Sequence, residues 1–189
     1  PQVASEKEVV ANERRYRVDD DVEGSVGEHL WATAFDRHPY RWPTIGWMAD
    51  IEGFTVEDCE KFYRTYYAPN NATIVLVGDL DPERALAKLQ EVYGGYRAAT
   101  IPDPPPDVEP EQAAERRTAL TKLTPTWKLN IGYRSPALGD PDHVPLSVLS
   151  EILVGGRSSR LLKTLVRDKE LASEVRGSLS PLRDPGLFE

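Results

Sequence analysis

The sequence predicts an α+β protein built as two incomplete lobes. Several stretches repeat apolar residues at helical spacing, few runs look like strands, and a proline-rich segment divides the chain. We expect the lobes at residues 1–97 and 118–189, with residues 98–117 as a semi-rigid linker. Because one or two strands cannot bury both faces of several helices, each lobe is expected to be part of a longer protein.

The first lobe begins with two expected helices. Ser5 and Glu8 have the spacing of a capping box, which predicts a helix through about Tyr16. Apolar residues at helical spacing predict a second helix over residues 25–35. Residues 38–46 contain two prolines and a glycine, so a loop is expected there.

The rest of the first lobe alternates helix and strand. Thr55 is placed to cap a helix over residues 56–67, and the chain's one cysteine, Cys59, is expected in it as a small buried apolar residue. The β-branched run 73–78 predicts a strand covered on both faces. An aspartate cap followed by proline predicts a helix within residues 81–93.

The second lobe is expected to contain short strands and two helices. Residues 127–133 alternate in the manner of a strand. Helices are predicted over residues 144–153 and 158–169, on either side of a glycine pair. Residues 174–179 suggest a further strand, and residues 186–189 suggest the beginning of another. The two lobes therefore share the pattern of helices packed on a small mixed sheet.

Composition excludes several classes of protein. The net charge of −8 argues against a nucleic-acid partner. No apolar run approaches the roughly 20 residues that a membrane span needs. A single cysteine rules out an internal disulfide or a thiolate metal cluster. The sequence assigns no compartment: it fits a bacterial periplasm or cell envelope and a cytoplasm equally.

The histidines do not form a recognisable metal motif. His29, His38 and His143 are not spaced four residues from one another, as a helical zinc pair requires. Glu28 and His29 could end an H-x-x-E-H motif, but its first position is Ser25. The other two histidines lie near prolines, where a structural or solvated role is expected.

Two glutamates share one helix face. Glu6 and Glu13 are seven residues apart, which is two helical turns and about 10 Å along the axis. One carboxylate could bind a metal while the other supports it. The spacing alone is equally typical of a solvated face that pairs with neighbouring basic residues.

Five segments of the sequence lie in an order that is characteristic of one protein family. The glutamate helix EKEVVANERR resembles the family's helix with two glutamates seven apart. HPYRWPTIG and the TVEDCEKFYRTYYAPNNA stretch follow in the family's order, then VLVGDLD and the GGRSSRL turn. The segments are residues 6–15, 38–46, 55–72, 75–81 and 155–161. In this order they resemble the insulinase/pitrilysin (inverzincin) family of zinc metallopeptidases.

The resemblance implies roles for both glutamates. The family binds zinc through an inverted H-x-x-E-H motif and a later glutamate. The resemblance places the metal ligand on Glu13 and a supporting role, through hydrogen bonds, on Glu6. Since H-x-x-E-H lies well upstream in the family, the chain is expected to be an interior fragment. It would hold the end of the zinc-ligand lobe and the start of a second, non-ligating lobe of the metalloprotease/processing-peptidase-like fold.

The implied parent protein is a Zn²⁺-dependent endopeptidase that hydrolyses peptides in a closed chamber. Its partners would be a peptide substrate and the missing parts of the same chain or a homologous subunit. The isolated fragment is predicted to be inactive and to bind zinc weakly or not at all. One alternative is a non-catalytic chamber or scaffold subunit of the same family. A second is a self-contained binding module with no enzymatic ancestry.

Overall fold

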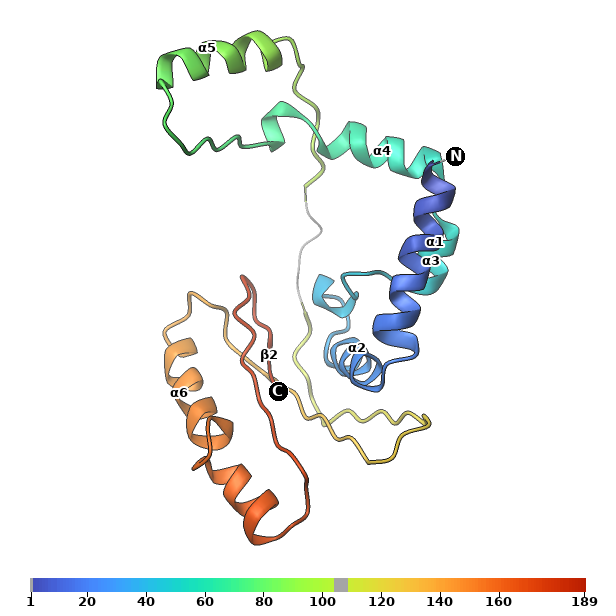
Figure 1. Ribbon diagram of the computed structural model, residues 1–189, viewed down its shortest axis with the longest axis vertical. Coiled ribbons are helices and arrows are strands. Elements are labelled where there is room, and N and C mark those ends of the chain that lie inside the picture. The colour runs from blue at the N-terminus through green and yellow to red at the C-terminus, as the bar shows by residue number, and fades with distance from the viewer. Residues whose placement is uncertain (1, 104–108) are drawn as a thin grey trace. The chain divides into compact units, whose positions relative to one another are not determined.

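The computed structural model describes residues 2–103 and 109–189, which Figure 1 traces from blue to red. The prolines at 104–106 of the expected linker lie outside the described residues. Every helix in the two described ranges is too short or too polar to cross a membrane. The elements are α1 (Gln2–Arg14), η1 (Arg15–Asp19), α2 (Val22–Ala34), η2 (Pro39–Arg41), α3 (Met48–Gly53), α4 (Val56–Tyr66), η3 (Pro69–Asn71), α5 (Pro82–Tyr93), β1 (Tyr133–Arg134), α6 (His143–Val154), η4 (Leu162–Asp168) and β2 (Leu187–Phe188). Of the segments labelled η, η1 and η4 are π-helical, and η2 and η3 are short 3-10 helices.

The chain divides into two compact units. The first unit comprises Pro1–Glu13 and Ile45–Asp107, and the second comprises Arg14–Thr44 and Val108–Glu189. The boundary at residue 13 falls one residue before the end of α1. The lobe limits given above, 1–97 and 118–189, stay a prediction.

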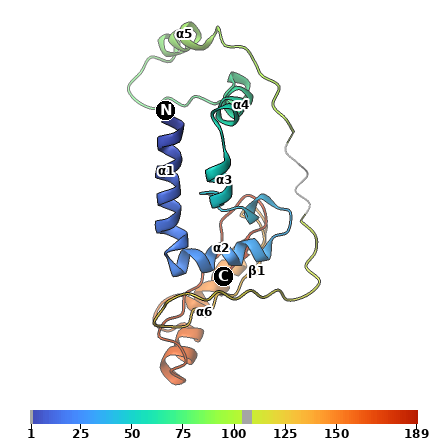
Figure 2. The same cartoon turned by 90° about the vertical axis from the view of Figure 1, so that its right-hand side faces the viewer.

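In the first unit, α3 anchors α1. Figures 1 and 2 both show α3 beside α1. The Lys7 ammonium donates hydrogen bonds to the backbone oxygens of Glu52 (2.8 Å) and Phe54 (3.0 Å). It also lies 5.2 Å from the centre of the Phe54 ring. Ala11 on α1 and Ile51 on α3 are buried, so one face of α1 is packed. The sequence did not predict α3.

The caps of α4 and α5 agree with the sequence. Thr55 and Asp58 form a capping box in which each side chain accepts from the other's backbone N–H. The Asp81 carboxylate accepts from two backbone N–H groups at the start of α5, and proline fills the first helical position. Cys59 was expected to be buried, and that was wrong: it is exposed, because the aromatic face of α4 itself faces solvent in this unit.

The predicted strand at residues 73–78 does not form. These residues have no regular structure, and the side chains of Val75 and Val77 are 75% and 93% exposed. A strand exists only through its hydrogen-bonded neighbour, and within the described residues no other strand pairs with this segment. Residues 73–78 therefore have the composition of a strand but lack a neighbouring strand with which to form a sheet.

In the second unit, α2 leads into an aromatic cluster. Asp21 caps α2 by accepting from the Gly24 N–H at 2.6 Å. Phe35, which follows the helix, is completely buried. The rings of Trp31 and Tyr40 pack against Phe35, stacked at 5.5 Å and edge-on at 5.9 Å between ring centres. This cluster fixes the loop that connects α2 to η2.

The sheet of the described residues is one antiparallel pair. Tyr133 lies opposite Phe188, and Arg134 lies opposite Leu187, whose side chain is 1% exposed. The predicted strand at 186–189 is confirmed as β2. In the strands predicted at 127–133 and 174–179, β pairing is limited to Tyr133 and to a single bridge at Leu179. The α+β class is confirmed, with helices far outweighing strands.

Three helix boundaries differ from expectation. α2 begins at Val22, after its Asp21 cap, and not at residue 25. α1 already includes Gln2, so Ser5 lies inside the helix and is not its cap; residues 2–4 are compatible with helix and extend it. The predicted helix at 158–169 begins only at Arg160 and continues as η4. α6 matches the prediction within one residue at each end.

Candidate functional site

The two glutamates singled out in the sequence both lie on α1. Each residue turns an α-helix by about 100°, so Glu6 and Glu13 point within about 20° of each other. The packed face, which carries Lys7 and Ala11, is turned about 100° or more away from Glu6. The pair therefore occupies a face of α1 that the contact with α3 does not use.

Burial distinguishes the two carboxylates. Glu13 is half-buried, whereas Glu6 is exposed. Across the part of the chain that the structure describes, no group of three or more His, Cys, Asp or Glu side chains is arranged to hold a metal ion. The described residues thus offer one helix face with two carboxylates and do not complete a zinc site by themselves.

A buried ion pair follows directly after Glu13. Arg14 Nη1 and Nη2 donate to the two oxygens of Glu28 on α2, at 2.8 and 2.9 Å. Both side chains are 7% exposed, and Asp19 lies 3.4 Å from the same guanidinium. The hydrogen bonds to Glu28 raise the pKa of Arg14 despite its burial. Glu28 is therefore paired with Arg14 through both of its carboxylate oxygens.

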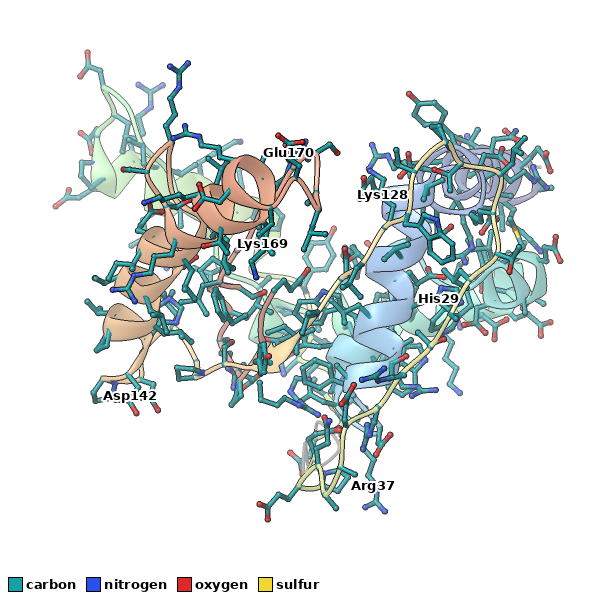
Figure 3. All side chains as sticks on the ribbon, turned by 90° about the horizontal axis from the view of Figure 1, so that it is seen from below. His29, Arg37, Lys128, Asp142, Lys169 and Glu170 are labelled. Carbon is teal, nitrogen blue, oxygen red and sulfur yellow. The ribbon has the colours of Figure 1, made fainter. Side chains whose placement is uncertain are left out.

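The three histidines lie apart in structural settings. Figure 3 shows His29 on α2, where its Nδ1 lies 2.9 Å from the Ser25 backbone oxygen. His38 is buried and accepts a hydrogen bond at Nδ1 from the backbone N–H of Tyr40. His143 is also buried, at the first residue of α6. A structural or a solvated role was expected for His38 and His143, and their burial fits the structural one.

A second polar site, in the second unit, was missed by the sequence reasoning. The carboxylate of Glu109, from the expected linker, accepts from the backbone N–H groups of Asp36, Arg37 and His38 at 2.7, 2.8 and 2.8 Å. Arg134 Nη2 donates a fourth hydrogen bond at 2.8 Å. Because three of the donors are backbone groups, no pattern of side chains in the sequence indicates the site.

These donors change the acidity of Glu109. Burial disfavours the charged carboxylate, but the three backbone N–H groups and Arg134 outweigh it and lower the pKa of Glu109 to about 2. The side chain of Glu109 is 12% exposed. It is therefore held as a carboxylate at any ordinary pH.

Comparison with known proteins identifies the family. Residues 53–189 match the Peptidase M16 inactive domain. The chain is 35% identical over 188 residues to the zinc protease PqqE of Helicobacter pylori, covering 97% of this chain and 42% of that protein. It is 26% identical over 198 residues to a probable mitochondrial-processing peptidase subunit beta of Schizosaccharomyces pombe, covering 98% and 43% respectively.

Solved structures agree with the sequence relatives. The crystal structure of a protease from Helicobacter pylori has a TM-score of 0.77 at 32% identity, over 99% of this chain and 46% of that one. A Peptidase M16 inactive domain from Pseudomonas fluorescens has the same fold, with a TM-score of 0.63 at 22% identity, over 99% and 45%. The chain thus spans less than half the length of these relatives. The chain belongs to the M16 peptidase family, as its resemblance to insulinase and pitrilysin predicted.

Proposed function

We propose that this chain is part of a zinc-dependent endopeptidase in which Glu13 binds the metal and Glu6 supports it. The Helicobacter pylori relative carries the name zinc protease, and relatives in Mycobacterium and Bacillus are named as uncharacterised zinc proteases. These names support a metallopeptidase parent. The residue roles rest on the resemblance of the glutamate helix and on the geometry of α1.

The observation that carries the proposal is the shared face of Glu6 and Glu13. Lys7 and Ala11 hold the adjacent face of α1 against its own unit, so the direction of the glutamate face is fixed. A half-buried Glu13 is suited to a ligand, which must give up its hydration. An exposed Glu6, about 10 Å along the axis, is suited to a supporting role with groups of the parent protein.

The remaining ligands would come from other parts of the parent protein. A single carboxylate does not hold Zn²⁺ selectively, because structural and catalytic zinc sites use three or four protein ligands. The 189 residues alone are therefore predicted to bind zinc weakly and to cleave no peptide. In the parent, residues 1–97 would form the C-terminal part of the zinc-ligand lobe. Residues 118–189 would form part of the wall of a closed peptide chamber.

Zinc analysis of the intact protein tests the assignment. Glu13→Gln should lower zinc occupancy strongly, and Glu6→Gln should lower it less. Glu8→Gln is the matched control, because Glu8 lies on the same helix but points about 140° away from Glu13. Occupancy that is equal in all three variants would show that the glutamate face is not the metal face.

A non-catalytic role in the same family is the second candidate. It is favoured by the match of residues 53–189 to a domain described as inactive. This candidate predicts an intact protein that purifies without zinc and shows no chelator-sensitive peptidase activity. Stoichiometric zinc together with activity that a chelator abolishes would exclude it.

A further inference from the structure

The carboxylate of Glu109 is bound as a ligand is bound. Its Oε1 accepts from the Asp36 N–H and from Arg134 Nη2, at 2.7 and 2.8 Å. Its Oε2 accepts from the N–H groups of Arg37 and His38, both at 2.8 Å. Each oxygen thus has two donors, and three consecutive backbone N–H groups converge on one planar group, as in anion-binding nests.

The receptor groups are held by contacts that do not involve Glu109. Arg134 also donates to the backbone oxygen of Ala34 at 2.6 Å, and its guanidinium stacks 3.8 Å above the Phe35 ring. Arg41 Nη1 donates to the backbone oxygens of Ala32 and Phe35 at the end of α2. The completely buried Phe35 fixes the loop in between. The aromatic cluster, Arg41 and Arg134 therefore support the nest through contacts of their own.

Neighbouring charges are consistent with an anion site. The carboxylate of Asp36 is turned to Arg116, whose Nη1 and Nη2 donate to it at 3.0 and 2.6 Å. The negative side chain next to the nest is thus neutralised by its own partner. The backbone N–H of Asp36 remains directed at Glu109. Figure 3 labels Arg37 in this loop, beyond the end of α2.

We propose that the backbone of Asp36–His38 and the guanidinium of Arg134 form a carboxylate-binding site, which the chain fills with its own Glu109. The specificity follows from the arrangement of two donors on each of two coplanar oxygens, which a carboxylate satisfies and a spherical halide does not. Glu109 acts as a ligand in cis that fastens its own segment of the expected linker to the loop after α2. This site is independent of the zinc proposal.

Removal of the tethered ligand should create a site for a soluble carboxylate. In the intact protein, Glu109→Ala lacks the side-chain carboxylate but keeps the nest and Arg134. Its midpoint of thermal unfolding should rise saturably with sodium acetate, relative to sodium chloride at the same ionic strength. The wild-type protein, whose site is filled, should show no acetate-specific rise. The double variant Glu109→Ala/Arg134→Met should lose most of the response.

The results that overturn the proposal are distinct. A Glu109→Ala variant that responds equally to acetate and chloride would refute it, as would an acetate response equal in the wild type. If that variant does not fold, Glu109→Gln provides a second measurement, because the amide presents only one acceptor oxygen to the four donors. Hydrogen exchange of the Arg37 and His38 amides should then be faster than in the wild type; unchanged exchange would refute the site.

Discussion

The buried pair of Arg14 and Glu28 offers a strong test of the second unit. Replacing Arg14 by Met removes the guanidinium and leaves Glu28 as a carboxylate in a site where its side chain is 7% exposed. The two hydrogen bonds of 2.8 and 2.9 Å are lost together with the charge that compensates Glu28. Breaking a buried pair from one side costs about 3–5 kcal/mol, chiefly because the surviving charge is desolvated without compensation.

The double replacement separates desolvation from packing. In Arg14→Met/Glu28→Leu, no buried charge remains, and two apolar side chains of similar length fill the space. We expect this variant to lie within about 2 kcal/mol of the wild type in free energy of unfolding. The single variants should therefore each be less stable than the double variant, and their effects should not add.

Equilibrium unfolding by urea, followed by circular dichroism, measures these differences. Arg64 and Glu60 on α4 provide the control, since they form the same type of pair at 2.9 Å with side chains 77% and 58% exposed. Arg64→Met should change the free energy of unfolding by less than about 1 kcal/mol. A cost for Arg14→Met as small as that of the control, or a double variant equal to the sum of the singles, would refute the reasoning.

Three further predictions follow from contacts described above. Because the folded pKa of Glu109 is about 2, against its usual 4.5, its stabilisation is complete above about pH 4.5 and is lost as the pH falls toward 2. That difference corresponds to at most about 3 kcal/mol, and Glu109→Gln should remove this part of the acid dependence of unfolding. Gly24→Ala should destabilise by about 1–3 kcal/mol, since a Cβ there would lie 2.0 Å from the backbone oxygen of Arg17. Gly27→Ala on the same helix has nothing within 4 Å of the added Cβ and should be neutral or slightly stabilising, and thermal unfolding distinguishes the two. Thr55→Ala should cost about 1 kcal/mol and increase hydrogen exchange at the first amides of α4; unchanged exchange would contradict a capping role.

Local signals in the sequence predicted local structure. The caps of α4 and α5 were predicted because donor and acceptor lie within three residues, at Thr55–Asp58 and Asp81–Arg84. The face shared by Glu6 and Glu13 followed from helical period alone. In these cases the physical cause lies within one or two turns of a single helix, where sequence reading is strongest.

Structure that depends on distant partners was predicted poorly. The β-branched run 73–78 has the composition of a strand, but a strand is defined by pairing, which composition does not specify. The Glu109 site joins residues 36–38 to a carboxylate more than seventy positions later, through backbone groups that every non-proline residue possesses. No pattern of residue types distinguishes such a receptor.

The anchor of α1 has a consequence for how this protein tolerates mutation. Lys7 binds the backbone oxygens of Glu52 and Phe54, so the side chain at position 52 contributes nothing to that contact. Substitutions at Glu52 should leave the helix that carries Glu13 in place. An insertion or deletion between Glu52 and Phe54 would change the spacing of the two acceptor oxygens. The position of the glutamate helix is thus insensitive to the side chain at position 52. It is sensitive to insertions and deletions in the segment that supplies the two oxygens.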